Sequence, residues 1–301
     1  MKVLIPGGSG FLGKVLVDAL LQKQHQVIVL TRDPQTVQMA PEVQIVAWDG
    51  KSAQGWGHFA GEVDAIVNLA GASIGAGHWT AERKARIRSS RQQAGQAIVE
   101  AVEKAGHKPS VLIQASGIGA YGDQGDRELD ETSPRGNDFL ASITEDWEAS
   151  TASVEQFGVR QVVIRTGLVT SRSAGWLQPL LPIFRLFVGG PLGSGNQWWP
   201  WIHIQDYVNS VLFLLNQADA RGVYNLVSPN PSRMKEFGKE LALVLKRPFW
   251  LPAPAFALKL ILGEMSMLVL EGQRALPKRM LASGYVYQYP QLRQALEAIF
   301  A

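Results

Sequence analysis

The feature that most constrains this chain is a glycine-rich turn near its start. The segment KVLI (2–5) is a short run of β-favouring apolar residues, and PGGSGFLG (6–13) follows it directly. Apolar residues at helical spacing continue through KVLVDALLQKQ, and VIVL (27–30) is the next apolar run. A strand, a glycine turn, a helix and a second strand within about thirty residues form the βαβ unit that carries dinucleotide-binding fingerprints.

The spaced glycines have separate physical roles in such a turn. Gly7 permits the tight turn out of the strand, Gly10 leaves room for a pyrophosphate against the backbone, and Gly13 lets the helix pack closely. The helix start offers free N–H groups and partial positive charge to phosphates. A structural turn without a ligand is the alternative, and the strand–helix context favours the cofactor site. The residues expected there are Gly7, Ser9, Gly10, Phe11, Leu12 and Gly13.

The end of the second predicted strand indicates which dinucleotide is bound. An acidic residue there would accept hydrogen bonds from the ribose and select NAD, but the sequence reads VLTRDP, with Thr31 and Arg32 at that place. An arginine pairs well with a 2′-phosphate. Asp33 comes one residue later and either faces away or caps the turn before Pro34. The pattern favours NADP over NAD, and a solvated surface residue is the alternative for Arg32.

Two further strand ends extend the predicted site. Asp49 follows the third strand, where such folds commonly place an Asp against the adenine amino group; a polar turn residue is the alternative. The fourth strand, within DAIVNLAGAS (64–73), ends in small residues that leave room for a cofactor at the carboxyl edge of the sheet. Leu69, Ala70 and Gly71 are therefore predicted cofactor neighbours.

Several motifs together resemble the short-chain dehydrogenase/reductase superfamily, in its extended, epimerase-like branch. They are GGSGFLG, NLAG, QASGIGAYGD and WIHIQDYV. NLAGASI, HWTAERKARIRSSR, DFLASITEDWE, GGPLGSGNQWWPWIHIQD and the tail from about Pro252 look, more narrowly, like the YfcH-like epimerase family proteins. The likeness covers essentially the whole chain and implies a C-terminal domain of unknown function.

The superfamily's usual catalytic pair is missing. Its members use a Ser or Thr, a Tyr, and a Lys four residues later that lowers the pKa of the tyrosine. None of the six tyrosines here is followed four residues later by lysine. In FLASITEDWE the usual Tyr and Lys places are held by Leu140 and Thr144, or by Phe139 and Ile143. The resemblance implies the same loss throughout the YfcH-like group.

Replacement residues are predicted around the fifth and sixth strands. Ser116 matches the superfamily's substrate-side Ser or Thr, and Tyr121 follows closely; a packed loop aromatic is the alternative for Tyr121. Arg91 matches a superfamily asparagine near the cofactor, and its guanidinium would bind pyrophosphate or ribose. The resemblance also implies that Ala115, Gly167, Leu168 and Val169 border the cofactor. Arg165 either orients a substrate or pairs within the fold.

An aromatic cluster is the predicted substrate pocket. Strand alternation in WIHI places Trp201 and His203 on one face, and Trp199 stands just before them. A satisfied core histidine is the alternative for His203. Asp206 is predicted to cap the helix DYVNSVLFLLNQ.

Composition excludes several other classes of function. Lys plus Arg exceed Asp plus Glu by three, too small a balance to indicate a nucleic-acid binder. Cysteine is absent, the five histidines lack ligand spacing for a metal, and no G-x-S-x-G elbow of a serine hydrolase occurs. The start does not resemble a secretory signal, and no stretch predicts a membrane span, so a cytoplasmic protein is expected.

The sequence therefore predicts a doubly wound α/β fold with a parallel sheet. We expect a Rossmann domain over 1–170 with returning segments in 201–228, and a smaller, mainly helical substrate-side part over 171–200 and 229–301. Two functions fit. One is an NADP-dependent oxidoreductase or epimerase-like enzyme on an unknown small substrate; the other is a non-catalytic NADPH-binding sensor that acts through a protein partner.

Overall fold

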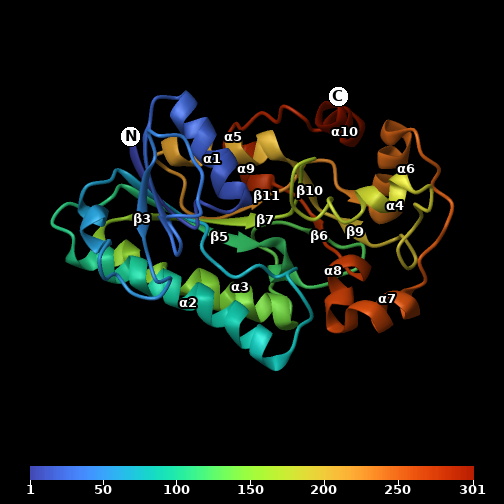
Figure 1. The fold of residues 1–301 in the computed structure, drawn as a ribbon, viewed down its shortest axis with the longest axis horizontal. Coiled ribbons are helices and arrows are strands. Elements are labelled where there is room, and N and C mark those ends of the chain that lie inside the picture. The colour runs from blue at the N-terminus through green and yellow to red at the C-terminus, as the bar shows by residue number, and fades with distance from the viewer.

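The computed structural model describes residues 1–301, and its centre is a sheet of seven parallel strands. The strand order is β11-β7-β5-β4-β1-β2-β3, which reverses direction at β1 as a doubly wound fold requires. The predicted fold class is confirmed (Figure 1). The strands are β1 (Lys2–Pro6), β2 (Gln26–Thr31), β3 (Gln44–Ala47), β4 (Ala65–Asn68), β5 (Val111–Gly117), β7 (Arg160–Thr166) and β11 (Gly222–Leu226).

The central strands are apolar on both faces because helices cover the sheet from both sides. On one side lie α1 (Phe11–Gln22) and α5 (Ile204–Asn216), which share a core with β1, β2 and β7. On the other side α2 (Ala81–Lys104) packs against β1, β4 and β5, and α3 (Phe139–Ala149) lies beside α2. Figure 1 shows the two layers above and below the sheet.

The far end of the molecule is built from short elements around a separate core. Trp199, Trp201, Phe237 and Leu241 lie in that core. Figure 1 places α4, α6 and α7 at this end, on the opposite side from the N-terminus. The helices are α4 (Leu181–Arg185), α6 (Met234–Leu245), α7 (Ala255–Leu262), α8 (Met267–Leu270), α9 (Lys278–Ala282) and α10 (Leu292–Phe300).

Three two-stranded pairs join distant parts of the chain. β8 (Leu168–Thr170) pairs with β10 (Trp201–His203), β9 (Trp198–Trp199) with β12 (Ser232–Arg233), and β6 (Glu128–Leu129) with β13 (Arg274–Ala275). Short 3-10 helices fill four connections: η1 (Gly57–Gly61), η2 (Ile118–Tyr121), η3 (Ala152–Phe157) and η4 (Gly263–Ser266). These pairs hold the small part and the tail against the large sheet.

The C-terminal tail packs partly on the Rossmann layers. Tyr285 and Tyr287 lie in the core shared with α5 and the sheet, and Arg279 donates to the carbonyl of Val223 in β11 at 2.7 Å. The predicted returning strand in 221–228 is β11, which adds the seventh strand beside β7. The predicted division into two parts stays a prediction.

The predicted cap of α5 is wrong. The helix begins at Ile204, and His203 is its N-cap: its Nδ1 accepts from the backbone N–H of Gln205 at 3.1 Å. Asp206 is fully buried and accepts from the backbone N–H groups of Gln288 and Tyr289, each at 2.8 Å. The local sequence favoured Asp206 as a cap. Instead, the Asp206 carboxylate accepts hydrogen bonds from backbone N–H groups of the tail, which need a partner because they are buried.

Candidate cofactor and active site

The glycines of the turn differ in whether the fold itself requires them to lack a side chain. Gly7 has φ of +80°, and a Cβ there would lie 2.8 Å from the backbone of Leu69 and Ala70. A Cβ at Gly13 would lie 2.5 Å from the backbone of Gly8. At Gly10, by contrast, φ is −74° and the nearest atom to a Cβ is 3.3 Å away. A Cβ at the exposed Gly10 would thus make one tight contact, with the carbonyl oxygen of Gly7, and packing requires glycine there less strictly than at Gly7 or Gly13.

The start of α1 is open to a ligand. Gly10 is the N-cap and has no side chain to cap the helix, and no acidic residue stands in the first turn. The first N–H groups of a helix have no partner within it, and the helix dipole adds partial positive charge. The predicted neighbours Phe11 and Leu12 are the first two residues of this helix. The geometry suits a phosphate, and nothing in the protein occupies that role.

The end of β2 presents a free cation. Arg32 is exposed and its guanidinium has no ion-pair or hydrogen-bond partner. Thr31 is buried and its hydroxyl oxygen accepts from Ser9 at 3.3 Å, so the turn and the strand end are tied together. Asp33 is exposed, and its carboxylate accepts no hydrogen bond within the protein. The strand end thus carries a free guanidinium where the sequence predicts a 2′-phosphate contact.

Asp49 closes a turn in the structure. Its carboxylate accepts from the backbone N–H groups of Lys51 at 2.7 Å and Ser52 at 2.9 Å, and from the Ser52 hydroxyl at 2.9 Å. The hydrogen bonds from Ser52 and Lys51 lower the pKa of Asp49 below its usual value. This is the geometry of the polar-turn alternative, and the adenine contact stays a prediction.

Arg91 lies buried under the end of β4. Its guanidinium donates to the carbonyls of Ala72 at 3.0 Å and Ile87 at 2.9 Å, and it stacks 4.5 Å from the ring of Trp147. No carboxylate pairs with it, its Nε has no partner, and burial lowers its pKa to about 10. A Cβ on Gly71 would lie 3.2 Å from this side chain. Arg91 is a buried positive charge without an anion.

The end of β5 carries a buried network centred on Glu148. Ser116 Oγ donates to Glu148 Oε1 at 2.6 Å, and Arg165 grips the same carboxylate with Nε at 2.9 Å and a terminal nitrogen at 3.0 Å. Arg135 forms a further ion pair with Glu148 and donates to the Thr144 hydroxyl at 3.3 Å. Two guanidinium groups and one carboxylate leave a net positive charge. Ser116, Glu148 and Arg165 are each at most 9% exposed.

The faces of α3 separate the two residue pairs considered for the usual Tyr and Lys places. Leu140 lies against Gly119: a Cβ on Gly119 would come within 3.1 Å of the Leu140 side chain. A Cβ on Gly117 would lie 3.9 Å from the Thr144 side chain. Phe139 instead packs edge-to-face on Trp79, 4.9 Å between ring centres, on the α2 side. Leu140 and Thr144 therefore face the end of β5, and the Arg135 guanidinium stands beside Thr144, near the place of the missing lysine.

Tyr121 is packed inside the protein. It is 0% exposed, its hydroxyl donates to Asn225 Oδ1 at 2.9 Å, and the Arg165 guanidinium lies 4.8 Å from its ring centre. Burial raises the pKa of Tyr121 above its usual value. Ala115 is also buried, one residue before Ser116. The structure thus places Tyr121 against Arg165 and Ser116 against Glu148, which pairs with Arg165, and both hydroxyl protons are already donated.

The residues after β7 that are predicted to border the cofactor pack against segments from later in the chain. Gly167 donates to the carbonyl of Leu226 at 3.1 Å, and a Cβ on it would lie 2.0 Å from the carbonyl oxygen of Pro200. Leu168 and Val169 continue as β8 beside β10. This position permits only glycine for reasons of packing alone.

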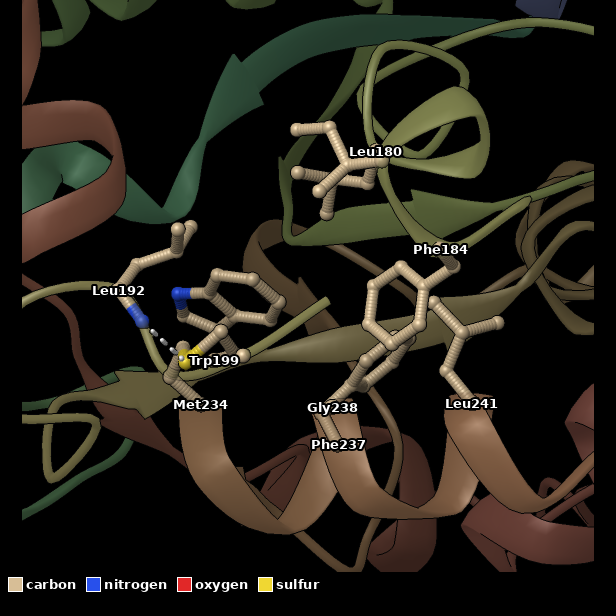
Figure 2. Close-up of a pocket in the computed structure, with 10 residues that line it drawn as sticks. Leu180, Phe184, Leu192, Trp199, Met234, Phe237, Gly238 and Leu241 are labelled. Atoms are coloured by element: carbon tan, nitrogen blue, oxygen red, sulfur yellow. Dashed lines mark hydrogen bonds between the residues drawn. The ribbon is translucent and has the colours of Figure 1, made fainter. Parts of the chain in front are cut away.

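The predicted aromatic pocket is split. Trp199 and Trp201 lie in the small core, and Trp199 borders a cavity of about 20 Å³ with Phe184, Met234 and Phe237 (Figure 2). His203 stacks on Tyr289, 4.0 Å between ring centres, and borders a different hollow of about 470 Å³ with Ser171 and Ser173. Burial lowers the pKa of His203 to about 4. The cavity at Trp199 is too small for a substrate.

Arg135 is the functional candidate that sequence reasoning missed. A signal for it existed: Glu148 falls four residues after Thr144, on the helix face that points to the cofactor edge, and a buried carboxylate needs cations. Which loop supplies the cation depends on tertiary folding.

No group of three or more His, Cys, Asp or Glu side chains lies close enough to hold a metal ion. None of the helices has both the length and the apolarity that a bilayer span requires.

Comparison with known proteins agrees with the fold and the resemblance. Residues 3–226 match the NAD dependent epimerase/dehydratase family, and residues 253–299 match a domain of unknown function, DUF1731. The chain is 38% identical to the "Epimerase family protein SDR39U1 homolog, chloroplastic" of Arabidopsis thaliana, over 99% of this chain and 86% of that protein. It is 36% identical to the "Epimerase family protein YfhF" of Bacillus subtilis, over 100% and 98%.

A solved structure extends the comparison. The human epimerase family protein SDR39U1, crystallised with NADPH, superposes with a TM-score of 0.88 at 32% identity, over 100% of this chain and 99% of that chain. The resemblance inferred from the sequence motifs is confirmed.

Proposed function

Because this chain belongs to the NAD dependent epimerase/dehydratase family, we propose that it is an NADPH-binding oxidoreductase or epimerase-like enzyme for a small carbonyl or alcohol substrate. It works without a Tyr–Lys pair. The observation that carries this proposal is the buried cationic network of Arg135, Arg165 and Glu148 at the end of β5. It stands where the superfamily places its catalytic groups.

The residues present fit NADPH. The open start of α1 and the exposed backbone at Gly10 suit the pyrophosphate, and the free guanidinium of Arg32 suits the 2′-phosphate. Arg91, a buried cation with an orphaned Nε, suits a ribose or phosphate oxygen. The human relative crystallised with NADPH supports the same assignment. When bound, the cofactor would supply or accept hydride.

The chain's own groups would act by electrostatics. A carbonyl oxygen that gains negative charge is stabilised by preorganised donors, and a guanidinium with unused N–H groups is such a donor. Arg135 uses one nitrogen on Thr144 and another on Glu148, and its side chain is 27% exposed, so it retains donors and access. Glu148 and Arg165 would hold this guanidinium in place.

Ser116 and Tyr121 remain the predicted catalytic hydroxyls, and the geometry narrows what they would do. Ser116 donates its proton to Glu148 and keeps its oxygen lone pairs, so it would accept a hydrogen bond from a substrate hydroxyl. Tyr121 donates to Asn225 and lies under Arg165, so it would position that arginine. Neither arrangement provides a ready general acid.

The same saturation supports the second candidate, a non-catalytic NADPH sensor. Every hydroxyl and carboxylate of the network already has a partner, which is the condition of a structural ion-pair cluster. A sensor would bind NADPH and present a changed surface to another protein. The two candidates differ in a single property, which is hydride transfer.

The test is NADPH oxidation, followed by absorbance, across a panel of small aldehydes, ketones and keto acids. The enzyme proposal expects turnover that falls at least about tenfold in Arg135→Met, the loss of one charge-assisted hydrogen bond in the transition state. Arg127→Met, an exposed arginine in the loop before β6, is the matched control. No turnover on any compound, with tight NADPH binding intact, would reject the enzyme and favour the sensor.

A further inference from the structure

One end of the molecule exposes apolar side chains on an unusual scale. Seven large apolar residues there are more than half exposed. Among exposed large apolar side chains, only Leu281 and Val286 lie outside the stretches at this end, 183–188 and 243–261. Figure 1 places α4, α6 and α7, which carry or adjoin these stretches, at the same end. We name this surface the apolar end: Leu186, Phe187, Leu243, Trp250, Phe256, Leu260 and Ile261.

The exposure is built into the backbone. Phe187 has φ of +65°, a conformation that bulky residues rarely adopt and that costs stability. Trp250 holds it there: its Nε1 donates to the carbonyl of Phe187 at 2.8 Å, and its backbone N–H donates to Gly189 at 2.8 Å. The Arg247 guanidinium covers the Phe187 ring at 4.7 Å. These contacts fix aromatic rings outward where burial would be the default.

The apolar end is basic. The stretches 173–193 and 241–263 contain Arg185, Lys246, Arg247 and Lys259 and no acidic residue, although the chain has 26. All but Arg247 are exposed. Two copies facing each other would set these cations against one another, which opposes self-association. The charge favours a negatively charged partner.

The described cavity at this surface is too small to anchor such a partner. The cavity beneath Ile183 and Phe184 measures about 20 Å³, which is too small for an anchoring side chain of another protein. What the end does offer is protruding aromatic and aliphatic groups beside lysines and arginines. A fluid lipid interface accepts protruding side chains without a preformed pocket, and anionic headgroups attract the cations.

We propose that the apolar end docks onto an anionic lipid surface. The aromatic and aliphatic side chains enter the interfacial layer, and Arg185, Lys246 and Lys259 lie among the headgroups. This docking is peripheral, since no helix could span the bilayer. It is independent of the cofactor chemistry proposed above, because none of these residues belongs to that site.

Vesicle sedimentation with the full chain tests the proposal. Sucrose-loaded vesicles of phosphatidylcholine with phosphatidylglycerol should pellet the protein, and pure phosphatidylcholine should pellet much less. Each of Lys246→Glu and Lys259→Glu should weaken partitioning by at least about fivefold, the effect of one cation near an anionic surface. Added salt should weaken it further.

Apolar variants and their controls complete the design. Phe187→Asn keeps a residue that tolerates positive φ and should reduce pelleting about tenfold or more, as removal of a large interfacial ring predicts. Phe256→Ser with Leu260→Ser tests the α7 side, should Phe187→Asn fail to fold by circular dichroism. Val286→Ser, also an exposed apolar site but outside the apolar end, should pellet like the unmodified protein.

Three outcomes would overturn the proposal. The first is absence of pelleting with anionic vesicles. The second is an equal loss in Val286→Ser, which would indicate general hydrophobic adsorption. The third is a dimer in sedimentation velocity that disappears in Phe187→Asn, which would make this face an interface between copies of the chain.

Discussion

The turn after β1 and the end of β5 both border the predicted cofactor site, but they differ in how far their polar groups are exposed and paired within the protein. At the turn, Gly10 is exposed and brings no side chain to cap α1, and the exposed guanidinium of Arg32 has no ion-pair or hydrogen-bond partner. At β5, Ser116, Glu148 and Arg165 are buried and bonded to one another. Groups left open by a fold are available to a ligand, while saturated groups stabilise the fold. The groups proposed to bind the cofactor are thus left open, and the groups at the place proposed for acid–base chemistry form an ion-pair network.

The largest expected effect comes from breaking the saturated region. Glu148→Gln removes the carboxylate that neutralises two guanidinium groups, and Arg165 is only 4% exposed. An uncompensated buried charge costs about 3–5 kcal/mol. Urea denaturation should show that loss. Glu145→Gln, exposed on the same helix, should change stability by no more than about 0.5 kcal/mol. Equal stability of the two variants would mean that the network is solvated and the contrast is false.

The next effect comes from filling the open region. In Gly10→Val the only close contact of the new Cβ within the protein is the Gly7 carbonyl oxygen at 3.3 Å, so the chain should fold after a small local shift. The branched side chain would stand where the pyrophosphate is expected, and NADPH affinity should fall by roughly a hundredfold, about 3 kcal/mol of charge-assisted hydrogen bonds. Calorimetry measures the affinity. Gly106→Val, at another open glycine, is the control. Undiminished binding in a folded Gly10→Val protein would place the phosphate site elsewhere.

A smaller effect separates the two cofactors. Arg32→Ala removes the free guanidinium at the end of β2 and should weaken NADPH binding by roughly ten- to a hundredfold, about 1.5–3 kcal/mol. NADH binding should hardly change, because NADH lacks the 2′-phosphate. Fluorescence titration of both cofactors measures this. An unmodified protein that binds NADPH and NADH equally would contradict the selectivity inferred from Arg32.

The open region was predictable from sequence and the saturated one was not. Gly7, Gly10 and Arg32 fall within one βαβ unit, so local spacing is sufficient to assign their places. Arg135 reaches Glu148 from a loop, and Tyr121 reaches Asn225 across 104 positions. Such partners depend on tertiary packing. The same reason separates Trp199 from His203: alternation placed their faces correctly, but α6 and the tail decide which cavity each borders.

The smallest expected effect is an absence of change, and it sharpens the comparison most. A lysine-activated tyrosine would give turnover a titration near neutral pH, because the hydroxyl pKa is lowered toward 7. Burial instead raises the pKa of Tyr121. Its hydroxyl therefore stays protonated throughout the neutral range, so the rate of hydride transfer should show no step between about pH 6 and 9 that depends on Tyr121.

The measurement is a pH–rate profile on any accepted substrate, with Tyr121→Phe and Ser116→Ala alongside. Tyr121→Phe removes one hydrogen bond to Asn225 and should lower stability by about 1 kcal/mol without altering the shape of the profile. A near-neutral step that vanishes in Tyr121→Phe would show that the buried hydroxyl titrates after all. The end of β5 would then be an active acid–base site, and its saturation in this structure a resting arrangement that substrate binding opens.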